Sequence, residues 1–307
     1  MRAAFADELL RQARADDRVV LLTGDLGFGV LEPFATELPD RFFNAGVAEQ
    51  NMVGMATGLA EAGFLPFAYS IATFASMRGY EFLRNGGALH ELPVRVVGMG
   101  GGLDYGHNGV THYALEDVGI MRVQPSVTVI APADADQARV ALGASMELPN
   151  PVYFRLSKEG SAVPGLDGRF GLGEAPMIGD GEDVALIALG TMASSAVQAA
   201  EQLAAHGVAS TVAVVSSLNP SPVDDLAALL RRVPLAISVE AHYVNGGVGS
   251  LVAEVIAEHG LGCRLIRRAV DEMPRGVTGS PAYLYERYGL SPTQLAAAAL
   301  DALGVAA

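Results

Sequence analysis

The chain has 307 residues, half of them hydrophobic, and a formal net charge of -14. That length exceeds the size at which one hydrophobic core usually keeps growing, so we expect two domains. The acidic balance argues against a general binder of nucleic-acid phosphates, and no apolar run approaches the ~20 residues that a membrane helix needs. We therefore expect neither nucleic acid nor membrane as a partner.

The first residues and the single cysteine bear on the compartment. Residues 1–14 carry acidic side chains at helical spacing, rather than a basic segment followed by an apolar one, so we expect no secretory signal. Cys263 cannot form an internal disulfide, and beside a predicted strand it is expected to be a small buried hydrophobic residue. Both features predict a cytoplasmic protein.

Short β-rich runs alternate with helical stretches in the first half of the chain. In order, we predict a strand at 19–22, a helix opened by Glu49, strands at 94–98 and 127–130, a helix at 134–145 and a strand at 149–156. This alternation is typical of a parallel sheet with helices on both faces. The domain is expected to cover 1–165, and the Gly- and Pro-rich segment 166–182 is predicted to be a linker.

A second series of the same kind follows. We predict strands at 184–189, 210–215, 235–239 and 264–266, and helices at 194–205, 223–230, 250–258 and 291–303. Ser291 caps the last helix, with Pro292 in its first turn. The predicted fold class is therefore α/β with two doubly wound domains, the second covering 183–307.

Three glycine clusters could suggest a nucleotide site, at 24–29, 98–102 and 246–249. None completes the dinucleotide-binding pattern. The first two follow predicted strands, where backbone must approach a ligand in an open α/β sheet, so they are expected to line a site. For the third we expect helix–strand packing.

Glu49 stands where a strand-like run turns through Gly46 into an apolar helix. An acid in a first helical turn often does no more than complement the helix dipole and the exposed N–H groups. The motifs around it give this carboxylate a second interpretation. They are Thr23-Gly24-Asp25-Leu26, Gly46 to Asn51, Gly63-Phe64-Leu65-Pro66-Phe67, Gly109-Val110-Thr111-His112, Leu115-Glu116-Asp117, Ala131-Pro132-Ala133-Asp134 and Pro151 to Leu156.

Together these motifs resemble the pyrimidine-binding domain of transketolases, and the resemblance runs on through the second half of the chain. There, Val239-Glu240-Ala241-His242, Gly246 to Ser250 and Tyr288-Gly289-Leu290-Ser291 are similar to the C-terminal domain of the family. The whole chain looks like the corresponding subunit of a split transketolase, in which the diphosphate-binding half is another polypeptide.

The resemblance implies thiamine diphosphate as the cofactor and assigns four residues to it. Glu49 would hydrogen-bond the pyrimidine ring and support the tautomer that removes the thiazolium proton. Asp25 would lie near the cofactor, with a turn or cap residue as the alternative, and Phe74 would pack around the pyrimidine, with a plain core residue as the alternative. Ile71 stands where the family usually stacks a phenylalanine, which removes an aromatic face.

The resemblance also implies substrate contacts around His112. This histidine matches the active-site histidine that contacts substrate oxygens, and imidazole can donate or accept protons near neutrality. Asn108 stands where an aspartate often contacts an acceptor hydroxyl, and we place His107 among the substrate contacts too. His107 and His112 could mimic metal ligands, but no third ligand is evident, so we predict no metal site on this chain.

Transketolases bind the acceptor phosphate with arginines, a serine and a histidine. The matching positions here hold Arg2, Gly29, Gly100 and Lys158, so the serine and histidine are missing and one arginine is a lysine. The lysine ammonium is a point charge and cannot form the two parallel hydrogen bonds with which an arginine guanidinium binds a phosphate. We therefore expect an altered acceptor, such as a modified or nucleotide-linked sugar.

Arg155 is a further candidate substrate contact, close to Lys158 in the sequence. Both residues have a plain alternative as solvated charges at the end of a strand.

The chain lacks the motif that binds the metal and diphosphate. Gly179-Asp180-Gly181 opens like it, but no asparagine lies between Asn150 and Asn219, so this tripeptide is more simply a turn. A divalent ion such as Mg²⁺ would then be held by a diphosphate-binding partner subunit, and an α2β2 heterotetramer is the expected assembly.

The implied activity is transfer of a two-carbon ketol unit from a ketose to an aldehyde acceptor. One alternative is the beta subunit of a 2-oxo acid dehydrogenase, which shares the layout and the cofactor, although Gly109 to His112 favours transketolase. Another is a non-catalytic scaffold partner, since a fold by itself proves no activity. The presence of Glu49 argues against the scaffold.

Overall fold

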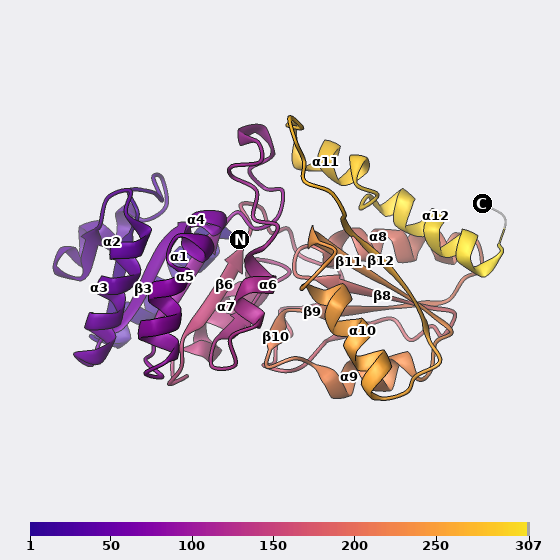
Figure 1. The fold of residues 1–307 in the computed structure, drawn as a ribbon, viewed down its shortest axis with the longest axis horizontal. Helices are drawn as coiled ribbons and strands as arrows, with labels where there is room; N and C mark the ends of the chain where they lie inside the picture. The colour runs from indigo at the N-terminus through magenta and orange to yellow at the C-terminus, as the bar shows by residue number, and fades with distance from the viewer. Residues whose placement is uncertain (306–307) are drawn as a thin grey trace.

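The protein, here a computed structural model that describes residues 1–305, has two α/β domains, as predicted (Figure 1). The first contains strands β1 (Val19–Thr23), β2 (Phe42–Asn44), β3 (Leu65–Ile71), β4 (Arg95–Met99), β5 (Thr128–Ile130) and β6 (Val152–Leu156). Its helical segments are α1 (Arg2–Ala15), α2 (Glu32–Glu37), η1 (Pro39–Arg41), α3 (Glu49–Glu61), α4 (Ala72–Met77), α5 (Tyr80–Phe82), η2 (Leu83–Ala88), η3 (Gly106–Asn108), α6 (Asp117–Arg122) and α7 (Ala135–Ser145).

The second domain contains β7 (Met177–Ile178), β8 (Val184–Leu189), β9 (Ser210–Val215), β10 (Ser217–Asn219), β11 (Leu235–Tyr243) and β12 (Arg264–Val270). Its helices are α8 (Met192–Ala205), α9 (Val223–Leu230), α10 (Val248–Glu258), α11 (Pro281–Arg287) and α12 (Pro292–Leu303). Most predicted elements are confirmed within a few residues. The strand predicted at 235–239 runs on to Tyr243.

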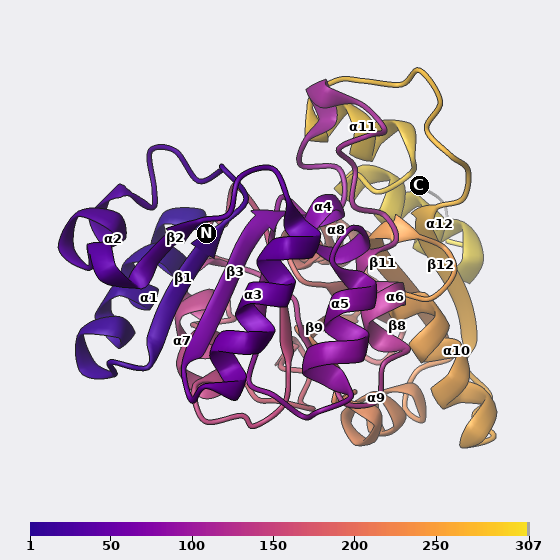
Figure 2. The same cartoon turned by 60° about the vertical axis from the view of Figure 1, so that its left-hand side comes forward.

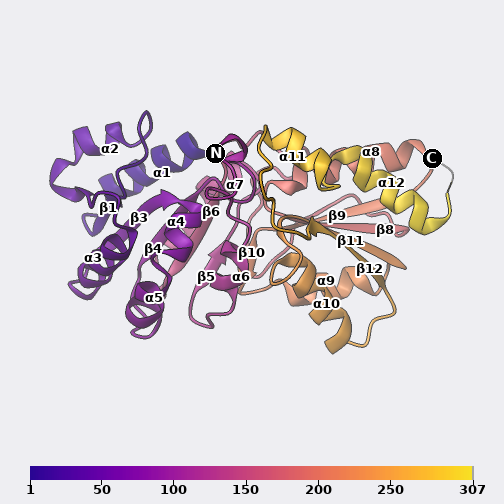
Figure 3. The same cartoon turned by 45° about the horizontal axis from the view of Figure 1, so that its top comes forward.

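The sheet of the first domain has the order β10-β5-β6-β4-β3-β1-β2, and β1 to β6 run parallel. Strands β1, β3, β4 and β6 are buried along their whole length, as expected for a parallel sheet covered on both faces. Helices α1 and α7 pack on one face, and α3, α4 and α6 pack on the other (Figure 3). Figure 2 shows α3 and α5 in front of this sheet.

The register of three neighbouring strands positions the candidate site. Thr23 at the end of β1 is paired with Asn44 of β2 and with Tyr69 of β3. The segments that leave these strands, including the turn into α3 and the start of α4, therefore emerge at one edge of the sheet. This is the edge at which open α/β sheets bind ligands.

The sheet of the second domain has the order β12-β11-β8-β9-β7, with α8 and α12 on one face and α9 and α10 on the other (Figure 3). The glycines at the start of α10 serve helix–strand packing, as predicted. A Cβ at Gly247 would lie 1.8 Å from Glu240 Oε2 on β11, and one at Gly249 would lie 2.7 Å from Ser238 Oγ.

Of the strands that were not predicted, β7 and β10 bear on the boundary between the domains. β7 lies inside the predicted linker and pairs antiparallel with β9 at the edge of the second sheet. β10 crosses to the first sheet and pairs antiparallel with β5. Asn219 anchors this crossing, since its Nδ2 donates to the carbonyl oxygens of Gln124, Pro125 and Val127.

Two more expectations concern the single cysteine and the length of the helices. Cys263 is buried, as predicted, and burial raises the pKa of its thiol to about 11. Within residues 1–305, no helix combines the length and the apolar character needed to cross a membrane.

Candidate active site

Glu49 is the first residue of α3 and only 2% of its surface is exposed. Its Oε1 accepts a hydrogen bond from Ser70 Oγ at 3.0 Å, and Arg78 Nη1 donates to its Oε2 at 2.9 Å. Gly24, directly after β1, lies on another side of this carboxylate, because a Cβ there would be 3.5 Å from Oε1. Glu49 is therefore more deeply buried, and held by more partners, than complementing a helix dipole requires, and its role in the chemistry stays a prediction.

The turn before α3 is held by side chains from two strand ends. Asp25 Oδ1 accepts a hydrogen bond from Asn44 Nδ2, and Asn44 Oδ1 accepts one from the Gly46 N–H, both at 2.9 Å. Asp25 and Gly46 have φ angles of 60° and 70°, in the left-handed region. Asp25 is exposed and its side chain joins the end of β1 to the end of β2, and a place near the cofactor stays a prediction.

A row of basic and aromatic side chains, called the row below, continues from Glu49. The guanidinium of Arg78 lies 4.0 Å from the centre of the Phe74 ring, and Phe74 packs edge-to-face against His112 with ring centres 5.2 Å apart. His112 is half-buried, and its Nδ1 is 3.0 Å from Thr111 Oγ1. The structure thus brings together Glu49, Phe74 and His112, which are distant in the sequence.

The row extends to Lys158 at its far end. The ring of Tyr105 is 6.1 Å from that of His112, and Lys158 Nζ lies 3.5 Å above the centre of the Tyr105 ring. Burial lowers the pKa of Lys158, the nearby Asp104 opposes this effect, and Arg2 lowers the pKa further. Arg2 is therefore within electrostatic reach of Lys158, at the start of α1.

Three other predicted residues lie outside this row or contribute only apolar packing. Ile71 is buried at the junction of β3 and α4. His107 and Asn108 are exposed in the short turn η3, whose Gly106 accepts a hydrogen bond from the Gly279 N–H of the second domain. The described residues contain no group of three His, Cys, Asp or Glu side chains that could hold a metal ion.

Arg155 corrects one expectation. Its alternative interpretation as a solvated charge is wrong, because only 8% of its surface is exposed. Its Nε donates to Asp117 Oδ2 at 2.9 Å, and its Nη2 donates to the carbonyl oxygens of Ala114 and Ala241. Since Ala241 belongs to β11, Arg155 joins the two domains, and a contact of Arg155 with substrate stays a prediction.

The sequence analysis did not single out Ser70, Arg78 or Tyr105. For Arg78 a signal was present, because it follows Phe74 by four residues, the spacing that places two side chains on one helix face. Ser70 lies in a fully buried strand that was itself not predicted. For Tyr105 no local pattern marks its contact with Lys158, 53 positions later.

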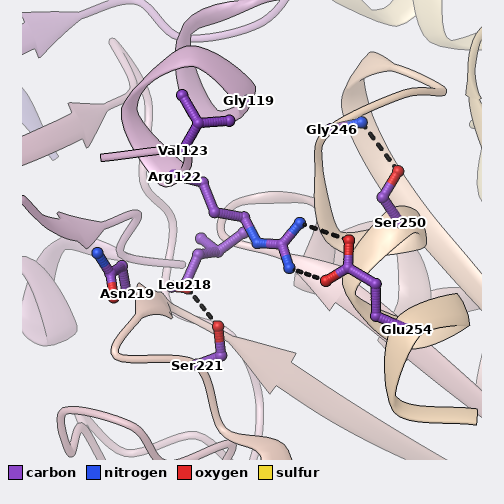
Figure 4. Close-up of a pocket in the computed structure, with 9 residues that line it drawn as sticks. All are labelled: Gly119, Arg122, Val123, Leu218, Asn219, Ser221, Gly246, Ser250 and Glu254. Atoms are coloured by element: carbon purple, nitrogen blue, oxygen red, sulfur yellow. Dashed lines mark hydrogen bonds and ion pairs between the residues drawn. The ribbon is translucent and has the colours of Figure 1, made fainter. Parts of the chain in front are cut away.

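Two of the cavities between the domains differ in their relation to the site. One of about 470 Å³ is lined by residues of α6, β10 and α10, among them the ion pair of Arg122 with Glu254 (Figure 4). It contains none of the predicted site residues. The other, of about 310 Å³, is lined by Lys158 together with Asp104, Thr191 and Tyr285. It therefore adjoins the far end of the row.

Comparison with known proteins agrees with this architecture. The family model described as the transketolase pyrimidine binding domain matches residues 1–162, and that of the transketolase C-terminal domain matches residues 173–295. The chain is 35% identical to a putative transketolase C-terminal section of Methanocaldococcus jannaschii, over 96% of this chain and 94% of that protein. It is 34% identical to the 6-deoxy-6-sulfo-D-fructose transketolase subunit of a Clostridium species, over 97% and 93% of the two chains.

Two further relatives extend the comparison. A subunit of the apulose-4-phosphate transketolase of Phocaeicola vulgatus is 33% identical over 98% of this chain and 96% of its own length. Among solved structures, a split gene transketolase described as an inactive beta4 tetramer superposes with a TM-score of 0.90 at 35% identity, covering 99% of this chain and 98% of the other. This chain therefore belongs to the transketolase family, as a transketolase-like subunit that comprises the pyrimidine-binding and C-terminal domains.

Proposed function

We propose that this chain is one subunit of a split, thiamine-diphosphate-dependent transketolase that moves a two-carbon ketol unit from a ketose to an aldehyde acceptor. The observation that carries the proposal is the buried Glu49 carboxylate, held between Ser70 and Arg78 at the start of a row that includes Phe74 and His112. When bound, thiamine diphosphate would supply the thiazolium carbon that accepts and releases the two-carbon unit.

The residues around Glu49 suit the pyrimidine end of this cofactor. A buried carboxyl can hydrogen-bond a ring nitrogen without competition from water, which is the contact that proton sharing between the two requires. Ser70 orients Oε1. The Arg78 side chain is 46% exposed, so its guanidinium can leave Oε2 and free that oxygen for the ring. Phe74 offers an aromatic surface one step away, and Ile71 an apolar one.

His112 is proposed to act on the substrate. Its Nδ1 is engaged with Thr111, which leaves Nε2 to donate to, or accept from, a sugar oxygen. Arg2 and Lys158 would receive the distal end of the acceptor. Contacts of the acceptor hydroxyls with His107 and Asn108 require these exposed side chains to turn toward the row.

A partner subunit completes the proposed enzyme. It would bind the diphosphate through Mg²⁺ or a similar ion and assemble with this chain as an α2β2 heterotetramer in the cytoplasm. Relatives named as a transketolase section or subunit support a divided enzyme, and so does the relative described as an inactive tetramer of beta chains.

The proposed acceptor is an uncommon sugar rather than the usual pentose phosphates. Gly29, Gly100 and Lys158 at the acceptor positions support this. The relatives named for 6-deoxy-6-sulfo-D-fructose and apulose-4-phosphate carry the names of uncommon ketoses, which would be donors, and they support uncommon sugars as substrates more generally. Turnover of xylulose 5-phosphate with ribose 5-phosphate at ordinary transketolase rates would refute it.

The first test is assembly with the cofactor. This chain is mixed with a candidate diphosphate-binding subunit from the same organism, and binding of thiamine diphosphate with Mg²⁺ is measured by calorimetry. Tight binding only in the mixture supports the split enzyme. Binding by this chain alone, or none in any mixture, contradicts the two-subunit proposal.

The second test separates the reactions. The assembled complex is offered ketoses with aldehyde acceptors, and separately 2-oxo acids with an electron acceptor. Ketol transfer supports the proposal, whereas turnover of 2-oxo acids alone replaces it with the dehydrogenase alternative. A complex that binds the cofactor and turns over neither class supports the scaffold.

A further inference from the structure

Lys158 is the only lysine in the chain, since all other residues among the twenty Lys and Arg are arginines. The two side chains differ physically. The ammonium is a compact point charge with three donors, and the guanidinium is a planar fork. A chain that uses arginine at every other basic position therefore places its one compact cation at the far end of the candidate active site.

Two consecutive residues hold this lysine at both of its ends. Asp104 Oδ2 accepts a hydrogen bond from the Lys158 backbone N–H at 2.9 Å and one from Ser157 Oγ at 2.6 Å. The ring of Tyr105 lies beneath the ammonium, at 3.5 Å. This distance is well inside the range of about 6 Å in which a cation and an aromatic face attract each other.

Gly100 makes room for the Tyr105 ring. Gly100 has a φ of +77°, and a Cβ at this position would lie 2.2 Å from Tyr105 Cε2, closer than two carbons can approach. A side chain at position 100 and the Tyr105 ring are therefore mutually exclusive in this arrangement. The Tyr105 ring therefore fills the space that a side chain at position 100 would occupy.

Lys158 is exposed and is one of the residues that line a cavity. The interdomain cavity of about 310 Å³ is lined by Lys158, and the hydroxyls of Ser161, Thr191, Ser194 and Tyr285 belong to lining residues. Asp104 is engaged with Lys158 and Ser157, so Glu159 is the remaining charged lining residue. The cavity offers one ammonium and several hydroxyls to a ligand.

We propose that Tyr105 is a positioning and specificity-determining residue, whose ring, admitted by Gly100, holds the single lysine so that its ammonium receives the anionic end of the acceptor. This inference rests on the proposed function for the identity of the ligand as an acceptor sugar. The shared chemistry of that end is a tetrahedral oxyanion, either a phosphate or a sulfonate. The position of the ammonium over the ring is a matter of Tyr105 and Gly100 and does not require the proposed function.

The first experiment observes Lys158 directly. Reductive methylation of the full chain with ¹³C-formaldehyde labels only Lys158 and the terminal amine, and loss of one NMR signal in Lys158→Arg assigns the lysine. We expect the Tyr105 ring current to shift this signal upfield, the shift to persist in Tyr105→Phe, and the shift to vanish in Tyr105→Leu and Gly100→Ala. An unchanged shift in Tyr105→Leu would overturn the proposal.

The second experiment uses the assembled enzyme and its acceptor. Tyr105→Leu is expected to raise the acceptor KM by about two- to thirty-fold, the range that corresponds to loss of one cation–π contact. The donor KM and kcat should change much less, and Tyr105→Phe should behave as the native enzyme. Thermal unfolding of each variant shows whether the chain still folds. Equal acceptor KM values in Tyr105→Leu and Tyr105→Phe would contradict the role of the ring.

Probe anions distinguish the two oxyanions and separate this inference from the proposed function. Inorganic phosphate and methanesulfonate are titrated into the labelled complex, and the anion that saturates the Lys158 signal at the lower concentration identifies the favoured class. Saturation by neither overturns the anion-binding role. If ketol transfer is absent but the Tyr105-dependent shift is present, only the proposed function fails. If transfer is normal but the shift is absent, only this inference fails.

Discussion

Glu49 combines burial with two polar partners from different elements. Ser70, which belongs to β3, donates a hydrogen bond to Oε1. Arg78, the residue directly after α4, donates one to Oε2. A buried carboxylate without such partners would carry a large desolvation penalty. At the scale of single residues, the site is therefore one buried carboxylate, one half-exposed cation and an aromatic row that leads to His112.

Replacing Glu49 by Gln tests the role of that carboxylate. Gln keeps the size and can accept the hydrogen bond from Ser70, but it cannot exchange a proton at this position. Because acid–base catalysis commonly contributes 10²- to 10⁴-fold, we expect kcat of the assembled enzyme to fall by about that factor. Calorimetry with the partner subunit should show unchanged assembly. Full activity in Glu49→Gln would remove Glu49 from the chemistry.

At the scale of elements, the junction of β11 with α10 shows how a polar residue can end a strand prediction too early. The prediction stopped at Val239 because Glu240 and His242 interrupt the apolar run, yet both residues are buried in β11. Glu240 accepts hydrogen bonds from the backbone N–H groups of Val248 and Gly249, at the start of α10. The strand continues because the helix supplies the donors that a buried carboxylate needs.

The close packing of Gly247 against Glu240, at the start of α10, predicts that one added methyl group lowers the free energy of unfolding. In Gly247→Ala the new Cβ would overlap Glu240 Oε2, so either the helix or the carboxylate must move. We expect a loss of about 2–4 kcal/mol in the free energy of unfolding, measured by urea denaturation. Gly262→Ala is the matched control, because a Cβ there meets nothing within 4 Å. Equal stability of the two variants would contradict the close packing at Gly247.

Glu240 also predicts a pH dependence of stability. Burial raises the pKa of its carboxyl from 4.5 to about 7, although the N–H groups of Gly249 and Val248 favour the ionised form. The folded state therefore binds more protons than the unfolded state between these pH values, and stability is lost as the pH rises from about 4.5 to 7.

Glu240→Gln removes this titration. The unfolding free energy of the native chain, relative to that of Glu240→Gln, should fall by about 3 kcal/mol between pH 4.5 and 7. Urea denaturation at several pH values measures the difference. His242 Nδ1 lies 3.9 Å from Glu240 Oε2 and burial lowers the pKa of His242, so the difference reports the titration of this pair. Parallel stability curves would show that Glu240 titrates alike in the folded and unfolded chains.

At the scale of the whole molecule, the second domain supports the loop that carries Tyr105 and His112. Tyr113 Oη donates to the carbonyl oxygen of Gly106 in this loop and lies 2.7 Å from that of Val277 in the second domain. Figure 1 shows the same loop beside the segment that leads into α11. With β10 in the first sheet and Arg155 bonded to Ala241, the domains form a continuous support for the site.

The buried Arg155–Asp117 pair predicts a large effect on stability. Arg155→Met leaves Asp117 buried without its cation, so we expect a loss of about 3–5 kcal/mol in the free energy of unfolding. The matched control is Arg122→Met, which removes an interdomain ion pair with the half-exposed Glu254 and should cost about 1 kcal/mol or less. Urea denaturation compares the two, and similar losses would contradict the structural role of Arg155.

Local patterns in the sequence determined much of this protein. Apolar strands such as 184–189 and 210–215, and the helix at 223–230, were predicted with their observed bounds. The strands are unbroken apolar runs that the fold buries, and the helix carries apolar residues at helical spacing. The turn into α3 and the motif that ends in His112 likewise carry their information within a few residues. β3 escaped prediction, since Pro66 and Ser70 weaken its strand signal although the whole strand is buried.

Only the tertiary structure decided which distant residues meet. The partners of Glu49, the crossing of β10 and the burial of Arg155 between two domains join residues that lie at least 21 positions apart. The same holds for the contact between the Lys158 ammonium and the Tyr105 ring. A local pattern reports the period of burial along one element, whereas these contacts depend on the order and register of strands in a sheet. That order places side chains from separate elements at one edge, and no short segment encodes it.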